Sequence, residues 1–295
     1  MQIGIFFCLK VMETKIAIQG IQGSFHHQVA MEYYHPEVVV EECLSFNALV
    51  VNLLNGDSAQ AVMAIENSIA GSIIPNYALI DRNNLHIIGE HYITVHQNLM
   101  ALKGQRIEEI KEVHSHPMAL LQCGDFFSKH PHIKLVEDVD TAETARRIQS
   151  GQLKGIGAIA SKTAAQLYQL EIVAPEIQTI KNNMTRFVIV KKENSVIPEE
   201  LINKASLKFE LDHKRGSLAA VLNVMSDCKL NLTKIQSLPK IETPWKYSFF
   251  VDVTFERYQD YSKALQLLGI MASHLKVLGA YQNQNTSEKN TAYSL

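Results

Sequence analysis

Hydroxyl, amide and guanidinium side chains gather in two short stretches of this chain. The first is IENSIAGS at 65–72. The second, KNNMTRFVIV at 181–190, places Thr185 and Arg186 directly before an apolar run. A hydroxyl beside a fixed cation at a strand edge can hold an anion and hydrogen-bond an oxygen atom. Ordinary loop polarity is the simpler interpretation, so the surrounding elements must decide between the two.

Residue types that could bind a metal or a cofactor lack the spacing that such sites need. The histidine pairs belong to no HExxH motif and have no cysteine pair beside them, which favours packing or surface roles. GIQGSF at 20–25 matches neither GxGxxG nor a Walker loop, and no GxSxG elbow is present. The sequence therefore predicts no cofactor and no metal; the histidines concerned are His26, His27, His114 and His116.

The bulk composition is that of an ordinary globular protein. The chain has 295 residues, of which 46% are hydrophobic and 20% charged, and this length predicts two or three domains. A net charge of -2 gives no reason to expect nucleic acid or an anionic membrane as a partner, so an anion site would have to be local.

The cysteines and the first residues predict a cytoplasmic protein. The apolar run in MQIGIFFCLKVMETK is too short to span a bilayer and no cleavage site follows it; Met12 is an alternative start. The cysteines are scattered and form no CxxC pair, which fits a reducing compartment; they are Cys8, Cys43, Cys123 and Cys228.

Short apolar runs alternate with helical stretches from 15 to 190. This alternation predicts an α/β domain with a largely parallel sheet. The expected strands are 15–19, 59–67, 110–114, 133–139 and 155–160, followed by helices within 20–34, 68–80, 115–127, 140–151 and 161–170.

The predicted helices share a chemistry at their first residues. Each opens on a hydroxyl or small polar residue, which for any one of them is best interpreted as an ordinary N-cap. As a set they would gather at one edge of a parallel sheet, where helix N-termini can bind carboxylates or phosphates. The residues are Ser24, Ser68, Ser115, Asp140 with Thr141, and Ser161.

The pattern changes after 190. Charge, Asn-Ser and Pro198 predict a linker at 191–204. The order then becomes strand, helix, strand, strand, helix, strand, which is ferredoxin-like, and a polar tail occupies 282–295. The strands are expected at 205–211, 230–238, 245–255 and 277–281, and the helices at 215–228 and 262–275.

Five segments in order resemble the prephenate dehydratase family. IENSIAGS and NNMTRF resemble its two signature motifs, and the segment at 205–280 is similar to the ACT regulatory domain that often follows it. The resemblance therefore covers nearly the whole chain. The remaining segments are GIQGSFHHQVA at 20–30, SHPMALLQC at 115–123 and AIASKTAAQLYQLEIVAPEIQ at 158–178.

This resemblance implies a fold and a reaction. The catalytic unit, 15–190, would be a two-lobed, periplasmic-binding-protein-like α/β unit with the active site in the cleft between the lobes, followed by a ferredoxin-like ACT domain at 205–281. The family converts prephenate to phenylpyruvate, water and carbon dioxide in phenylalanine biosynthesis. Aromatisation drives the reaction, so no cofactor is needed.

The resemblance also implies roles for particular residues. Thr185 resembles the catalytic threonine that hydrogen-bonds the leaving oxygen, while Glu66 is expected to support the site, by capping or by pairing with Arg186. The expected substrate-binding residues are Ser24, Asn67, Ser68, Ser115, Ser161 and Arg186. Met118 stands where the family usually has glutamine, which removes an amide from that position.

In the regulatory segment, the resemblance implies phenylalanine as effector, bound by Gly216, Ser217, Leu218, Gln236 and Ser237. The usual Glu-Ser-Arg-Pro is Gln-Ser-Leu-Pro at 236–239 here, so we expect weaker inhibition than in relatives. We also expect self-association into a dimer or tetramer. Two alternatives stay open: the substrate is arogenate, or the chain is a non-catalytic small-molecule sensor.

Overall fold

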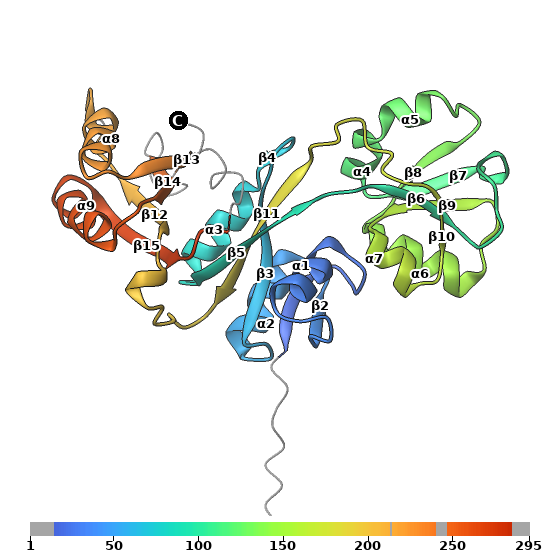
Figure 1. The fold of residues 1–295 in the computed structure, drawn as a ribbon, viewed down its shortest axis with the longest axis horizontal. Coiled ribbons are helices and arrows are strands. Elements are labelled where there is room, and N and C mark those ends of the chain that lie inside the picture. The colour runs from blue at the N-terminus through green and yellow to red at the C-terminus, as the bar shows by residue number, and fades with distance from the viewer. Residues whose placement is uncertain (1–14, 213, 240–246, 285–295) are drawn as a thin grey trace, which may run out of the picture.

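The protein consists of three bodies in a row, each built on its own sheet (Figure 1). The structure is a computed structural model that describes residues 15–212, 214–239 and 247–284. Predictions about the extension at 1–14 and most of the polar tail lie outside these residues. The central body is the first lobe, the second lobe lies at one side of it, and the C-terminal sheet lies at the other.

The first lobe is a mixed sheet in the order β2-β1-β3-β11-β5, with the short β4 paired to β3. Helix α1 covers one face, and α2 and α3 cover the other. The elements are β1 (Ile16–Gln19), α1 (Phe25–Tyr33), β2 (Val40–Cys43), α2 (Phe46–Asn55), β3 (Gln60–Asn67), β4 (Gly71–Ser72), α3 (Ile74–Arg82), β5 (His86–Thr94) and β11 (Met184–Lys191).

The second lobe has a five-stranded sheet in the order β10-β6-β9-β7-β8. Apolar clusters fill the space on both of its faces. The elements are β6 (Asn98–Ala101), a 3-10 turn (Ile107–Glu109), β7 (Glu112–Ser115), α4 (Pro117–Gln122), α5 (Gly124–Ser128), β8 (Lys134–Glu137), α6 (Thr141–Gly151), β9 (Ile156–Ala160), α7 (Lys162–Leu167) and β10 (Glu171–Ala174).

The chain crosses between the lobes twice, from β5 into β6 and from β10 back into β11 (Figure 1). The returning strand β11 inserts antiparallel between β3 and β5. In the second lobe, β6 runs antiparallel to both β9 and β10. The prediction of a largely parallel sheet is therefore wrong: the sheet of each lobe is mixed, because the crossings between the lobes send strands back in the opposite direction.

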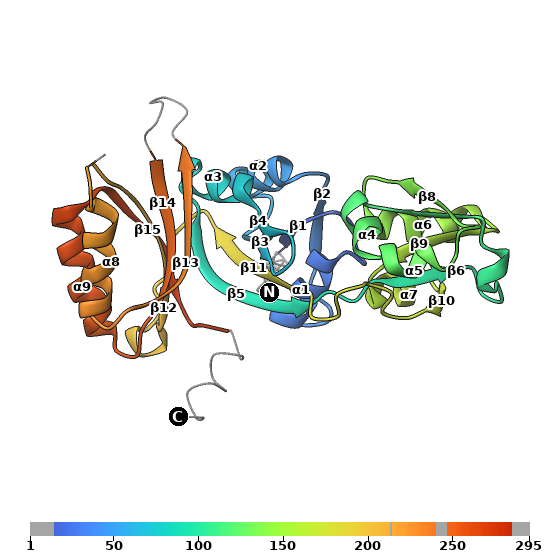
Figure 2. The ribbon, with the colours of Figure 1, turned by 90° about the horizontal axis from the view of Figure 1, so that it is seen from above.

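The predicted βαββαβ order after the linker is confirmed. The C-terminal sheet has the strand order β13-β14-β12-β15, and α8 and α9 cover the face that points away from the first lobe (Figure 2). Following a 3-10 turn (Glu199–Leu201), the elements are β12 (Lys204–Glu210), α8 (Ser217–Asp227), β13 (Asn231–Pro239), β14 (Tyr247–Thr254), α9 (Tyr258–Met271) and β15 (Ser273–Tyr281).

Two sequence boundaries move in this body. Residues 273–275, predicted as helix, belong to β15 because that strand pairs with β12 as far as Ser273. Strand β13 extends one residue beyond the predicted 230–238, because Pro239 still pairs with Tyr247 of β14. Tertiary pairing overrides local propensity in both cases.

The C-terminal sheet packs directly on the first lobe. Phe250, Leu278 and Tyr281 are part of the same buried apolar cluster as residues of α2, α3 and β3. Strand β15 approaches β5 so closely that a Cβ on Gly279 would lie 2.0 Å from the Ile87 carbonyl oxygen. A side chain at position 279 is therefore incompatible with this contact.

The predicted N-caps divide into two groups. Ser24, Asp140 and Ser161 are confirmed as the caps of α1, α6 and α7. Ser68 and Ser115 are not caps: Ser68 lies in the turn after β3, and Ser115 is the last residue of β7, leaving His116 to cap α4.

Candidate active site at the lobe junction

Thr185 and Asn67 form a polar pair at the end of the first lobe's sheet. They stand opposite each other on β11 and β3, and Nδ2 of Asn67 donates to Oγ1 of Thr185 at 2.9 Å. The threonine is buried, with 8% of its surface exposed. Because its oxygen accepts this bond, the hydroxyl hydrogen remains available for another acceptor.

Asn67 is fixed at both ends of its amide. Its Nδ2 also lies 2.6 Å from Oδ1 of Asn183, and its Oδ1 accepts from the N–H groups of Ile69 at 3.0 Å and Ala70 at 2.8 Å. The amide hydrogens are thus committed to the protein. We therefore revise the expected role of Asn67 from substrate donor to a residue that orients Thr185.

Amide side chains continue this network into the second lobe. Asn183 is fully buried, and its Nδ2 donates to Oε1 of Gln122, at the end of α4, at 3.1 Å. Nε2 of Gln97 donates to the same oxygen at 3.3 Å. Sequence reasoning missed Asn183 and Gln122. The doubled asparagine before Thr185 was an available signal for the first; nothing local marked the second.

The glycine loop of the first lobe seats against α7 of the second. Oγ of Ser161 donates to the Gly23 carbonyl at 2.6 Å while accepting from the N–H of Ala164. Gly23 has φ +91°, and a Cβ there would lie 3.1 Å from Cα of Ala164. Since Ser24 follows Gly23 and caps α1, the structure brings Ser24 and Ser161 to the same junction.

Ser68 and Ser115 make structural hydrogen bonds. Oγ of Ser68 accepts from the N–H of Met184 at 2.9 Å and so holds the start of β11. Oγ of Ser115 is completely buried and donates to the Ile159 carbonyl at 2.8 Å. Met118, which replaces the family's usual glutamine, is 42% exposed. A role of Ser68 and Ser115 as ligands stays a prediction.

Arg186 does not lie with these hydroxyls and amides. It is 5% exposed; its Nε donates to Glu90 at 2.7 Å, its Nη2 to the Tyr281 hydroxyl at 2.8 Å, and its Nη1 to Asp252. Successive strand residues point to opposite faces, so Arg186 faces the C-terminal sheet while Thr185 does not. We therefore correct the expected substrate contact: Arg186 is engaged in an interdomain ion network.

The electrostatics of this network favour the charged forms of Arg186 and Asp252. The carboxylates around Arg186, Asp252 first among them, hold its pKa well above the ordinary value despite burial. Burial opposes ionisation of Asp252, but the charge of Arg186 outweighs it and lowers the Asp252 pKa. Burial and the nearby Arg186 lower the pKa of Lys204, whose ammonium contacts Glu90 at 3.0 Å.

Glu66, expected to support the site by capping or by pairing with Arg186, lies between two cations. Its Oε2 lies 4.0 Å from Nη1 of Arg186 and 2.8 Å from Nζ of Lys234 on β13. The carboxylate is about one-third exposed, with 36% of its side-chain surface accessible. Its closest charged partner is therefore a lysine of the C-terminal sheet, which sequence reasoning did not identify.

The candidate effector residues occupy α8 and β13. Gly216 has φ +83° and caps α8, which starts at Ser217 and places Leu218 against the core of that body. Nε2 of Gln236 donates to the Ser237 carbonyl at 3.0 Å. Leu238 packs against the cluster shared with the first lobe, so an arginine there would enter that interface.

His26 and His27 are packing histidines, as expected. The His26 ring contacts Phe46 and Phe187, and its Nε2 accepts from the Ala64 N–H at 3.3 Å. Burial lowers the His26 pKa from 6.5 to about 3. The ring is therefore neutral in the folded protein at physiological pH.

We expect stability to fall as the pH drops below the ordinary His26 pKa of 6.5. Between pH 6.5 and about 3 the unfolded chain binds a proton that the folded chain rejects, which contributes up to about 1.4 kcal/mol per pH unit. His26→Gln, which keeps an acceptor for Ala64, should flatten this slope in urea unfolding between pH 7 and 5. His35→Gln, at an exposed site, is the control. An unchanged slope in His26→Gln would refute the assignment.

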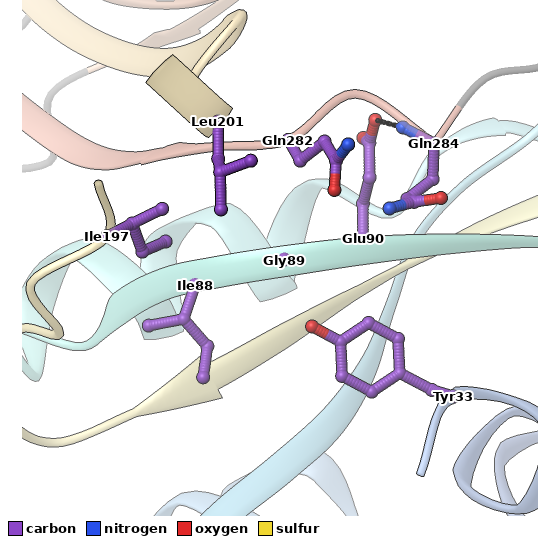
Figure 3. Close-up of a pocket in the computed structure, with 8 residues that line it drawn as sticks. All are labelled: Tyr33, Ile88, Gly89, Glu90, Ile197, Leu201, Gln282 and Gln284. Atoms are coloured by element: carbon purple, nitrogen blue, oxygen red, sulfur yellow. Dashed lines mark hydrogen bonds between the residues drawn. The ribbon is translucent and has the colours of Figure 1, made fainter. Parts of the chain in front are cut away.

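A pocket lies elsewhere, between β5, the segment before β12 and residues 282–284 (Figure 3). Glu90 lines it and accepts from the N–H of Gln284 at 3.2 Å. Neither Thr185 nor Asn67 lines it, so we do not place the reaction there.

Within the part of the chain that the structure describes, no three His, Cys, Asp or Glu residues could jointly hold a metal ion. The described helices include none with the length and apolar character needed to cross a membrane.

The fold and the site define a two-lobed α/β protein with hydroxyl and amide groups where its lobes meet. The sequence model of the prephenate dehydratase family matches residues 16–195, so the chain belongs to the prephenate dehydratase family. A relative from Arabidopsis thaliana, the chloroplastic arogenate dehydratase/prephenate dehydratase 2, is 34% identical over 283 residues. The match covers 92% of this chain and 74% of the relative.

Two solved structures share the fold along nearly the whole chain. One, described as a novel type of quorum-quenching acylase, has a TM-score of 0.83 at 25% identity and covers 92% of this chain and 99% of its own. The prephenate dehydratase of Arthrobacter aurescens, solved in complex with L-Phe, has a TM-score of 0.82 at 21% identity, and the match covers 95% of this chain and 97% of that one.

Proposed function

We propose that this protein is a prephenate dehydratase, a carbon–oxygen lyase that converts prephenate to phenylpyruvate, water and carbon dioxide. The observation that carries the proposal is the Thr185 hydroxyl, which Asn67 holds as an acceptor and whose hydrogen is left to donate. Membership in the family indicates the reaction, and this geometry provides a hydroxyl that can assist its most difficult step, the departure of hydroxide.

The chemistry requires one proton. The bond between the ring and its carboxylate breaks, carbon dioxide leaves, and the electron pair moves through the ring to expel hydroxide. Hydroxide is a poor leaving group, and a hydrogen bond or proton at the departing oxygen is worth roughly 10²–10⁴ in rate. Thr185 donates that hydrogen bond in this proposal; a threonine is too weak an acid to be the ultimate proton source.

We propose that the substrate lies where the two lobes meet. Ser24 and Ser161 cap α1 and α7 on opposite sides of this junction, and helix N-termini suit carboxylates. With Arg186 engaged elsewhere, the two carboxylates of prephenate would rely on hydroxyls and N–H groups. Ser24, Ser68, Ser115 and Ser161 remain the proposed contacts.

Turnover assays decide between the candidate functions. Pure protein is incubated separately with prephenate and with arogenate, and formation of phenylpyruvate and phenylalanine is followed. Turnover of prephenate supports the proposal. Turnover of arogenate alone would instead make the protein an arogenate dehydratase, the activity that comes first in the Arabidopsis relative's name. Turnover of neither would overturn both and leave the sensor.

We infer that residues 205–281 form an ACT regulatory domain, joined by a linker at 191–204 to the catalytic unit at 15–190. The βαββαβ order supports this, and the L-Phe complex of the Arthrobacter protein supports phenylalanine as effector. Gly216, Ser217, Leu218, Gln236 and Ser237 are the proposed contacts. A dimer or tetramer and a cytoplasmic location complete the proposal.

Light scattering and inhibition curves test the regulatory proposal. We expect at least a dimer at micromolar protein, and inhibition by phenylalanine that is weaker than in relatives with the usual Glu-Ser-Arg-Pro. A monomer both with and without phenylalanine would contradict the assembly, and unaltered kinetics at millimolar phenylalanine would contradict the effector.

A further inference from the structure

Strands β3 and β11 carry two adjacent cross-strand pairs, one on each face of the sheet. Thr185 stands opposite Asn67, and the next residues, Arg186 and Glu66, also stand opposite each other. Because successive strand residues point to opposite faces, the hydroxyl–amide pair and the charged pair share two backbone segments but lie on opposite sides of the sheet. Each member of the first pair is one peptide bond from a member of the second.

All four strands of the C-terminal sheet contribute to the network around the charged pair, three of them by direct contact and β12 through its partners. Strand β14 supplies Asp252 to Arg186, and β15 supplies Tyr281, 2.8 Å from Nη2. Strand β13 supplies Lys234, 2.8 Å from Oε2 of Glu66. From β12, the Ser206 hydroxyl bonds to both Asp252 and Tyr281.

The contacts around Arg186 are buried and so resist displacement, whereas at the Lys234–Glu66 pair the lysine side chain is buried and the Glu66 side chain is about one-third exposed. Asp252 is 2% exposed and Tyr281 is fully buried. Among the described residues, the cations of the cluster match its carboxylates in number: Arg186, Lys204 and Lys234 against Glu66, Glu90 and Asp252. Separating any buried pair leaves an uncompensated charge, so a shift of the C-terminal sheet must also move Glu66 and Arg186.

The same strand links this cluster to the proposed effector residues. Half-buried and exposed residues alternate along β13, so Lys234, Gln236 and Leu238 share the half-buried face. Gln236 is a proposed effector contact two residues from Lys234. The path from β13 to Asn67 therefore runs through one ion pair and one peptide bond.

We propose that Lys234 and Asp252 are positioning residues for Thr185. By holding Glu66 and Arg186 on one face of the sheet, they set the orientation of the Asn67–Thr185 pair on the other. The C-terminal sheet thereby reaches the reacting group without contacting it. This inference rests on the proposed function and deepens it, by naming the contacts through which the regulatory body acts on the site.

Lys234→Met tests the inference, with Lys276→Met as the matched control. Lys276 also runs from the C-terminal sheet to the first lobe, but it contacts Asp81 at the end of α3, away from β3 and β11. We expect Lys234→Met to lower kcat roughly 3- to 30-fold with KM changed less than about twofold, and Lys276→Met to leave both within about twofold. If Lys234→Met and Lys276→Met lost kcat equally, Lys234 would be only a docking contact and the proposal would be overturned.

Further variants separate positioning from general damage. Lys234→Arg keeps the charge and should retain most of the activity, whereas Asp252→Asn should lower kcat in the same sense as Lys234→Met. The double variant Glu66→Gln, Lys234→Met should lose no more kcat than the more impaired of the two single variants, because both substitutions break the same ion pair. If the losses of kcat in the two single variants added up in the double variant, the two residues would not act through one ion pair.

Hydrogen–deuterium exchange decides the structural step without any assay of activity. Lys234→Met should speed exchange at 66–70 and 184–186, and Lys276→Met should speed it near 81–85 instead. Unchanged exchange at 66–70 and 184–186 would overturn the inference even in an active enzyme. Inactive wild-type protein with the expected exchange pattern would refute the proposed function and leave the positioning contacts standing.

Discussion

Replacing Thr185 by valine should lower kcat by about 100-fold or more and change KM little. Valine keeps the shape of threonine and removes the only group at this position that can donate to a departing oxygen. Asn67 would lose one acceptor, but its Nδ2 keeps the carbonyl of Met184 at 3.2 Å and Oδ1 of Asn183. The folded structure should therefore change in stability by no more than about 1 kcal/mol. Steady-state kinetics with prephenate and thermal unfolding measure both effects.

Thr185→Ser is the matched control for this result. It keeps the hydroxyl next to Asn67 and should retain far more activity than the valine variant. A near-normal kcat in Thr185→Val would remove the threonine from the mechanism. Equal, large losses in the serine and valine variants would show that the methyl group, and with it packing, sets the rate.

Replacing Arg186 by methionine should destabilise the protein by about 3–5 kcal/mol, because it leaves buried carboxylates without their cation. Glu90 is fully buried and keeps Lys204, whereas Asp252 loses its ion-pair partner. Urea unfolding at neutral pH measures the loss. Arg186→Lys should restore only part of it, because a lysine has no planar fork to reach Glu90, Asp252 and Tyr281 together.

The loss of stability in Arg186→Met should also become smaller as the pH falls. Arg186 holds the folded-state pKa of Asp252 below 3.8, so the stability from this pair is present above pH 3.8 and is lost as the pH falls through the lower folded value. The gap between wild type and Arg186→Met should therefore narrow in acid.

The exposed pair of Lys15 and Glu41 provides the control for Arg186. Their side chains are 48% and 37% exposed, so Lys15→Met should have little effect on stability, because exposed ion pairs are screened by water and salt. A similarly small cost for Arg186→Met would show that the interdomain network contributes little to folding. It would also remove the physical basis for the coupling inferred through Arg186.

Much of the local structure follows from the sequence alone. Apolar runs identified β1, β3, β7, β8 and β9, and hydroxyl or carboxylate caps located the starts of α1, α6 and α7. These features depend on interactions within a few residues, which is why periodicity and cap chemistry reveal them. The βαββαβ order of the C-terminal body was also predictable, since each of its elements has its own periodic pattern.

Other features depend on contacts between distant segments. The strands that bridge the lobes, β5, β6 and β10, had no marked alternation, and the antiparallel insertion of β11 follows from its partners. Ser68 and Ser115 have the residue type of caps, but the sheets around them assign both to strand ends and turns.

The clearest division runs between Thr185 and Arg186. In the sequence both residues stand at the start of an apolar strand, within a segment that resembles a catalytic motif. This was enough to identify the threonine as a candidate catalytic residue. The sequence could not tell that a C-terminal sheet covers the other face of β11 and supplies Asp252 and Tyr281. Alternation along a strand fixes that neighbours point to opposite sides, but only tertiary packing decides what each side meets.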